Sequence, residues 1–198
     1  MFHKIKLRVV MKNLFNGNII SLFIWTLLLV FPSFAYSEND YFKVLKVGEV
    51  LPNAALMRFQ KPHFNLSDLK GRIKIISVVP QLNTPTCDEQ THRFSETNGG
   101  LDQYLDIITI STNSAKGQYE FSKKAKIKNI EFLSDAPNYE FGVKTGLLNK
   151  SFNYLKRTVL VVDKNNIIRY ADFVPGGGLP DINKALKAAK QILSKSNL

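Results

Sequence analysis

Apolar and β-branched runs alternate with amphipathic stretches along most of the chain. The run Ile73 to Val79 is apolar on both sides, which is typical of a central strand covered on both faces. Leu105 to Ser111 and Thr158 to Asp163 have the same character and predict two further core strands. Pro180 to Lys195 carries its apolar residues at helical spacing, so we expect an amphipathic helix there. These four segments supply most of the predicted core.

Shorter patterns lie between these segments. They predict a small hairpin or edge strands over 56–66, a helix over 84–97, a helix over 116–124, a short strand over 131–133, a turn of helix near Tyr139, and a strand over 167–173 after a turn at Asn165 and Asn166. Strands and helices alternate until two strands and a final helix close the chain. This order predicts an α/β fold with a central mixed β-sheet flanked by helices, the thioredoxin-like order.

The first 37 residues differ from the rest. They carry Lys and Arg but no acid, and an uncharged run, Ile19 to Phe31, follows the basic part. That order predicts a secretory signal and an exported protein, in a bacterium a periplasmic one. A membrane-spanning helix needs ~20 apolar residues, so the 13-residue run favours cleavage, with an anchor over 14–31 as the alternative. Residues 38–198 then form one domain.

The charge is basic but dispersed. The whole chain has a net charge of +11, and 38–198 hold 23 basic and 16 acidic residues, a net charge of +7. The densest basic stretch is one of lysines without interleaved aromatic residues: Lys123, Lys124, Lys126 and Lys128. A nucleic-acid surface would need arginine and aromatic side chains on one face, so we expect a solvated helix end and no nucleic-acid partner.

The chain has one cysteine, Cys87, in the sequence PQLNTPTCDEQ, residues 80–90. It therefore forms no disulfide within the chain. Thr84 is a good helix N-cap and Pro85 suits the first helical position, which places Cys87 in the first turn. The unpaired N–H groups of a first turn favour a thiolate, the nucleophilic form of cysteine. The alternative is a small buried apolar residue without chemistry.

Other cysteine chemistries fit the sequence less well. A cysteine protease needs a histidine beside the sulfur, but His92 lies about 140° around the predicted helix from Cys87, and His63 could approach only through the fold. One cysteine and these two histidines have no metal-ligand spacing, so we expect no metal. A disulfide oxidoreductase of the usual kind needs Cys-x-x-Cys, which is absent from the sequence.

The motif Pro80-x-x-x-Thr84-x-x-Cys87, after a strand and at the start of a helix, resembles the peroxidatic motif of peroxiredoxins. The wider sequence resembles their thiol peroxidase branch. The matching segments run in the family's order from Val47 to the C-terminal helix: VGEVLPNAAL, LSDLKGRIKIISVVPQLNTPTCDEQTHRF, ITIS, FLSD, FGVKTG and LKRTVLVVD. Three fixed residues alone are a weak signal, whereas the ordered set is a specific one.

The resemblance implies a role for each matching residue. Cys87 would be the peroxidatic cysteine, which attacks hydrogen peroxide or a small organic hydroperoxide and becomes a sulfenic acid. Thr84 would place its hydroxyl beside the thiolate and the peroxide, and Pro80 would shield the sulfur from water. Arg157 in LKRTVLVVD would hold the thiolate and stabilise the developing charge. The family uses no cofactor, and its members commonly form homodimers.

Two positions depart from the family pattern. Many relatives carry arginine five residues after the peroxidatic cysteine, where this chain has His92 followed by Arg93. The usual resolving cysteine would fall near Ser122, and a hydroxyl cannot resolve a sulfenic acid to a disulfide. The resemblance therefore implies reduction by an external thiol, either a small thiol or a thioredoxin-like protein. The alternatives are a non-enzymatic redox sensor or a thiol-disulfide exchange module on the same fold.

Overall fold

The structure is a computed structural model that describes residues 45–196, without the side chains of Pro62 and Ser196. The expected signal segment 1–37 and the alternative anchor 14–31 lie outside these residues. In chain order, the elements are β1 (Ala55–Arg58), β2 (Lys61–Asn65), the 3-10 helix η2 (Leu66–Leu69), β3 (Lys74–Val78), α3 (Pro85–Glu96), the 3-10 helix η3 (Leu101–Gln103), β4 (Asp106–Ser111), α4 (Ala115–Ala125), β5 (Glu131–Ser134), α5 (Glu140–Thr145), β6 (Leu148–Asn149), β7 (Tyr154–Leu155), β8 (Thr158–Val162), β9 (Ile168–Phe173) and α6 (Ile182–Ser196).

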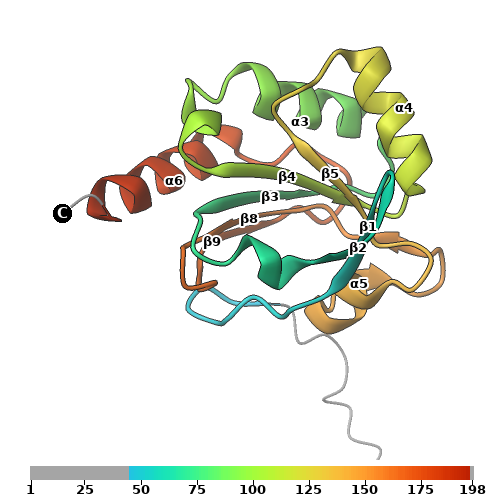
Figure 1. Cartoon of the computed structure of the whole chain (residues 1–198), viewed down its shortest axis with the longest axis horizontal. Coiled ribbons are helices and arrows are strands. Elements are labelled where there is room, and N and C mark those ends of the chain that lie inside the picture. The colour runs from blue at the N-terminus through green and yellow to red at the C-terminus, as the bar shows by residue number, and fades with distance from the viewer. Residues whose placement is uncertain (1–44, 197–198) are drawn as a thin grey trace, which may run out of the picture. The chain divides into compact units, whose positions relative to one another are not determined.

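Seven strands form one mixed sheet in the order β2-β1-β5-β4-β3-β8-β9 (Figure 1). The central strand β3 is parallel to β4, with Ile76 opposite Ile108, and antiparallel to β8, with Val78 opposite Thr158. All five residues of β3 are buried, as expected for a strand covered on both faces. The predicted mixed sheet flanked by helices is confirmed.

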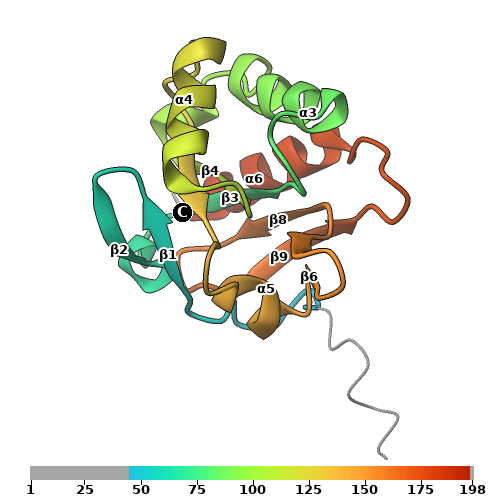
Figure 2. The same cartoon turned by 90° about the vertical axis from the view of Figure 1, so that its right-hand side faces the viewer.

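Each face of the sheet has its own apolar core. On one face, residues such as Ile75 and Val161 pack against Phe94 of α3 and Ala185 of α6. On the other face, residues that include Val78 pack with α5 and the short β6–β7 hairpin. Figure 2 shows α3, α4 and α6 on one side of the sheet and α5 on the other. The central strands are thus held from both sides, and their ends have fixed positions.

The stronger sequence patterns predicted the elements closely. The expected helix over 84–97 is α3, with Thr84 at the N-cap and Pro85 at the first helical position. The expected C-terminal helix is α6, where successive turns bury Ile182, Ala185 and Ala189. The four lysines near the end of α4 are all exposed, which agrees with a solvated helix end. Within residues 45–196, no helix is long and apolar enough to cross a membrane.

The start of α5 is supported by Asp135, just after β5. Its carboxylate accepts hydrogen bonds of 2.8 Å from the backbone N–H groups of Phe141 and Gly142. Burial raises the pKa of Asp135 to about 6, although these two bonds act in the opposite direction.

A β-carbon on Gly142 would lie 2.5 Å from Leu155 Cδ2 and 2.9 Å from Leu148 Cβ, so this position has room only for glycine.

Candidate active site

Cys87 is the third residue of α3, and its side chain is fully buried (0% exposed). It packs with Val79 at the end of the central strand and with Leu82 in the following loop, against half-buried Phe121 and Phe132. The helix begins where the sequence predicts it, at the N-cap Thr84 followed by Pro85. The apolar surroundings hold the sulfur inside the protein, at the carboxyl end of β3.

Arg157 reaches this sulfur from a distant part of the sequence. Its Nη2 lies 3.2 Å from Cys87 Sγ, and its side chain is only 6% exposed. The residue directly precedes β8, whose first residue, Thr158, pairs with Val78 at the end of β3. This antiparallel register brings Arg157 to the end of the sheet where the Cys87 loop begins. The buried guanidinium is therefore in direct contact with the sulfur.

Two further residues complete the contacts of the arginine. Arg157 Nη1 donates to Gln90 Oε1 at 2.5 Å, and Gln90 Nε2 donates to Ser77 Oγ at 2.8 Å. Gln90 and Ser77 are both fully buried. Gln90 lies three residues after Cys87 on α3, so both side chains are on the same face of the helix. Neither residue was predicted from the sequence, although a glutamine three residues after Cys87 on the buried helix face is a signal that can be read there.

Arg157 also has an unused donor. Its Nε is buried and makes no hydrogen bond within the part of the chain that the structure describes. Buried polar groups rarely lack a partner, and each exception needs a reason. The guanidinium thus holds the sulfur with one nitrogen and the helix with a second, and has a third donor to offer to another oxygen.

The hydroxyl of Thr84 donates to the carbonyl oxygen of Gln81 at 3.0 Å. It caps none of the first-turn N–H groups; instead the Thr84 carbonyl accepts from the N–H groups of Cys87 and Asp88. The predicted N-cap position is correct, but the side-chain cap is not formed. With its proton committed, this hydroxyl can still accept a hydrogen bond.

Pro80 follows Val79 directly and is half-buried. Its carbonyl oxygen accepts a hydrogen bond of 3.4 Å from the hydroxyl of Thr112, at the end of the neighbouring strand. Since Val79 packs against Cys87, Pro80 begins the loop that closes over the sulfur. The structure brings Pro80, Cys87 and Arg157 to one end of the sheet.

The charged residues on the outer face of α3 pair with one another. Arg93 Nη2 lies 2.6 Å from Glu89 Oε1, and His92 lies 2.9 Å from Glu96 and 3.7 Å from Asp88. Of the two acids that follow Cys87, Glu89 is therefore paired with Arg93, and Asp88 faces the imidazole ring of His92. Neither His92 nor Arg93 forms a hydrogen bond with the sulfur in the part of the chain that the structure describes, and His63 is exposed on β2. Within residues 45–196, no cluster of three His, Cys, Asp or Glu side chains could hold a metal ion.

Ser122 occupies the expected position of a resolving cysteine, on α4. Its hydroxyl donates to the carbonyl oxygen of Tyr119, one turn earlier in the helix. It also lines a small cavity of about 200 Å³ with Phe59 and Phe132, next to the stacked rings of Phe59 and Tyr119. Because Cys87 is the only cysteine in the sequence, a disulfide could form only with another molecule.

Comparison with known proteins gives a consistent result. Residues 46–186 match the family model described as Redoxin. The chain is 32% identical to a thiol peroxidase of Halalkalibacterium halodurans over 150 residues, which cover 75% of this chain and 90% of that protein. It is 33% identical to the thiol peroxidase of Bacillus subtilis, with 75% of this chain and 89% of that protein covered.

Solved structures agree with the sequence comparison. A peroxiredoxin-like protein from Aquifex aeolicus superposes with a TM-score of 0.70 at 26% identity, over 77% of this chain and 90% of that one. A thiol peroxidase from Chromobacterium violaceum gives a TM-score of 0.65 at 19% identity, over 78% and 89% of the two chains. At that identity the second match shows the fold alone, which confirms the predicted thioredoxin-like arrangement.

Proposed function

This chain belongs to the redoxin family, in the thiol peroxidase branch of the peroxiredoxins, and we propose that Cys87 is its peroxidatic residue. The protein is a thiol-dependent peroxidase. The observation that carries the assignment to Cys87 is the 3.2 Å contact between Arg157 Nη2 and Cys87 Sγ in a buried site. The only cysteine of the chain is thus beside a buried cation at a helix N-terminus.

In the proposed reaction, the Cys87 thiolate attacks one oxygen of the peroxide. A sulfur–oxygen bond forms and the O–O bond breaks, so that the sulfur is oxidised by two electrons to sulfenic acid. The second oxygen leaves with the bonding pair, takes a proton and departs as water or an alcohol. Arg157 stabilises the thiolate before attack and, through its unpartnered Nε, the charge on the leaving oxygen.

Thr84 would orient the peroxide in this scheme. Its own proton is donated to the Gln81 carbonyl oxygen, so its oxygen can accept the O–H of hydrogen peroxide or of a hydroperoxide. Pro80, at the start of the same loop, would limit the access of water to the sulfur. We propose these positions as the peroxide pocket together with Cys87 and Arg157.

Return to the thiol requires two equivalents of an external thiol. The first displaces water from the sulfenic acid to form a mixed disulfide, and the second releases Cys87 while the two external sulfurs form a disulfide. A small thiol or a thioredoxin-like protein would supply them. Because the Cys87 side chain is fully buried, a bulky reductant needs the first turn of α3 to open before it can reach the sulfur.

The test is a stoichiometric titration of the reduced full-length protein with hydrogen peroxide, followed by intact mass with and without a sulfenate trap. The expected product is one added oxygen per chain, formed much faster than on a free cysteine control and absent from Cys87→Ser. Oxidation of Cys87 no faster than of free cysteine would contradict the assignment of the peroxidatic residue.

A second experiment separates a peroxidase from a sensor. Steady peroxide consumption with small thiols or a thioredoxin system, abolished in Cys87→Ser, supports turnover by an external thiol. A single turnover that ends in a stable mixed disulfide with each reductant would instead favour the sensing or exchange module. The absence of a second cysteine is what makes this comparison decisive for the chain.

We also propose that the protein is exported, on the basis of the basic and apolar order of residues 1–37. N-terminal sequencing of the protein isolated from its native host should find a start near residue 38, whereas an intact N-terminus in the membrane fraction would support the anchor over 14–31. Assembly as a homodimer stays a prediction, and light scattering of the purified protein would test it.

A further inference from the structure

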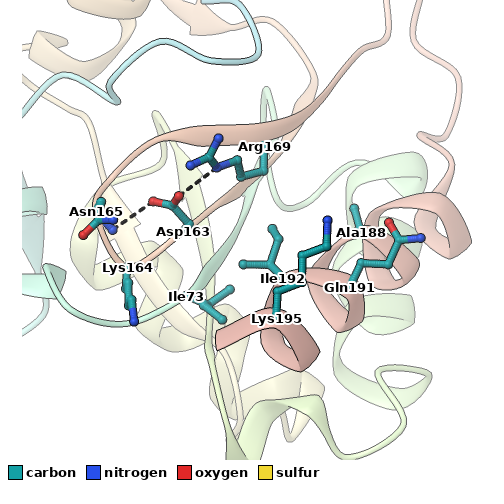
Figure 3. A pocket seen from close by; sticks show the side chains of 9 residues that line it. All are labelled: Ile73, Asp163, Lys164, Asn165, Arg169, Ala188, Gln191, Ile192 and Lys195. Carbon is teal, nitrogen blue, oxygen red and sulfur yellow. Dashed lines mark hydrogen bonds and ion pairs between the residues drawn. The ribbon is translucent and has the colours of Figure 1, made fainter. Parts of the chain in front are cut away.

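A cavity of about 520 Å³ opens at the end of the sheet opposite to the proposed peroxide pocket (Figure 3). It is formed by Ile73, just before β3, by the turn between β8 and β9, and by the last turns of α6. Lys74 at the start of β3 pairs with Val162 at the end of β8, whereas Cys87 and Arg157 lie beyond the other ends of these two strands. The cavity therefore shares no residue with the peroxide pocket.

One carboxylate lines this cavity, and its oxygens are already engaged. Asp163 Oδ1 accepts from the backbone N–H groups of Asn165 at 2.8 Å and Ile167 at 3.0 Å, and Oδ2 accepts from Arg169 Nε at 2.7 Å. Burial alone would raise the pKa of Asp163, but these bonds and the nearby guanidinium outweigh it and lower the pKa. Asp163 is thus charged, and its carboxylate oxygens already accept hydrogen bonds from groups of the protein itself.

The lining cations exceed this single acid. Arg169 bonds to Asp163 through Nε, which leaves its two terminal nitrogens as donors. Lys164 and Lys195 form no ion pair with an acid in the described part of the chain. Figure 3 shows the amine of Lys164 turned away from Arg169 and Lys195, so the latter two are the cations available to the cavity. The unbalanced charge is positive and favours an anion.

The rest of the lining includes an apolar surface. Ile73, Ala188 and Ile192 line the cavity, and Figure 3 shows Ile73 and Ile192 between the Asp163–Arg169 pair and Lys195. The volume lies within the range of ~300–1,000 Å³ that is usual for small-molecule sites. A bare inorganic anion would leave the apolar part of the cavity in contact with water.

We propose that this cavity binds a small organic anion, with its charged head against Lys195 and a short aliphatic body along Ile192 and Ile73 toward Arg169. Lys195 supplies the charge complementarity, and the isoleucines supply the apolar contact. This site is separate from the chemistry at Cys87 and does not depend on it.

The experiment is an amide NMR titration of the full-length, ¹⁵N-labelled protein with sodium hexanoate at constant ionic strength. We expect the shifted amides to cluster at Ile73, Arg169, Gln191 and Lys195. Hexan-1-ol, which lacks the charge, and inorganic phosphate, which lacks the aliphatic body, should each bind at least about fivefold more weakly. Equal affinity for hexanoate and for either of these compounds would overturn the proposal.

A matched pair of variants tests the charged end. Lys195→Gln should weaken hexanoate binding about fivefold, the effect of removing one partly exposed charged partner. Lys187→Gln, which removes an exposed lysine of the same helix outside the cavity, should leave it unchanged. Equal losses in both variants would indicate a general charge effect and would overturn the site. The rate of Cys87 oxidation by peroxide is expected to stay the same in both.

Discussion

Replacement of Gln90 by leucine is expected to slow the reaction of Cys87 with peroxide, although the hydrogen bonds of the Gln90 side chain join it to Arg157 and Ser77 and not to the sulfur. Gln90 Oε1 accepts a hydrogen bond from Arg157 Nη1, and Gln90 Nε2 donates to Ser77 Oγ. Leucine fills a similar volume but offers no acceptor. The buried guanidinium then loses one fixed partner and is free to turn away from Cys87 Sγ, which it contacts at 3.2 Å.

The expected size follows from the charge on the arginine. A hydrogen bond to a charged group contributes about 1.5–3 kcal/mol, and an unsatisfied buried donor costs a similar amount. If this energy is lost in the transition state, the second-order rate constant falls about 10- to 100-fold, since ~1.36 kcal/mol is a factor of ten. Any part of the loss that falls on the folded state will instead appear as a lower free energy of unfolding.

The assay therefore has two readouts. Stopped-flow mixing of reduced protein with hydrogen peroxide, quenched for intact mass, gives the rate of Cys87 oxidation, and urea denaturation gives the stability. Gln90→Glu retains an acceptor for Arg157 and should restore much of the rate, whereas Ser77→Ala removes only the outer bond and should have a smaller effect. A folded Gln90→Leu protein that reacts at the wild-type rate would refute the positioning role of Gln90.

Three further predictions concern the hydroxyl of the loop, a glycine and a buried acid. Thr84→Val should slow the reaction of Cys87 with peroxide about 10-fold or more. It should lower the free energy of unfolding by less than about 1 kcal/mol, because the Thr84 hydroxyl does not cap α3. Thr84→Ser should retain the rate, and equal rates for the two variants would show that the hydroxyl does not orient the peroxide. Gly142→Ala should lower the free energy of unfolding by about 1–3 kcal/mol, because the added β-carbon overlaps Leu155. Gly178→Ala is the control and should change it little, since a β-carbon there would lie 3.8 Å from Val174 Cγ1. Equal free energies of unfolding for the two variants in urea would contradict the packing argument. The pKa of Asp135 is raised to about 6, so the folded protein binds the Asp135 proton more tightly than the unfolded chain does. The free energy of unfolding, relative to that of Asp135→Asn, should therefore fall by up to about 3 kcal/mol as the pH rises from about 4 to about 6, and the difference should stay constant above pH 7. Urea denaturation across this pH range measures the difference, and a constant difference throughout would be evidence against the raised pKa.

The elements that the sequence predicted are those with strong local signals. The Thr84-Pro85 pair marks a helix start within two residues, and the buried run of β3 needs no knowledge of its neighbours. The two-residue strands β6 and β7 were missed because they are too short to show any periodicity. The 3-10 helices η2 and η3 were missed for the same reason.

The candidate site was predictable only in part. Cys87 stood out as a lone cysteine at a helix start, but Arg157 is 70 residues away and was found through the family resemblance. The Gln90–Ser77 connection depends on how α3 lies against β3, which no local pattern encodes. Lys74 was also unexpected: it lies within an apolar run, and its fully buried ammonium donates to the carbonyl oxygens of Leu69 and Arg72. Burial lowers the pKa of Lys74.

The pairing of Val78 with Thr158 has a consequence for the newly made chain. Arg157, the cation that we propose prepares Cys87 for attack, reaches the sulfur only when β8 joins β3, after a long-range contact has formed. Before that moment the thiol lies in a segment that lacks the guanidinium, and the proposed mechanism gives it no advantage over any other exposed cysteine. In the proposed mechanism, folding would therefore be the step that activates Cys87, and a copy without the β3–β8 pairing would react slowly with peroxide.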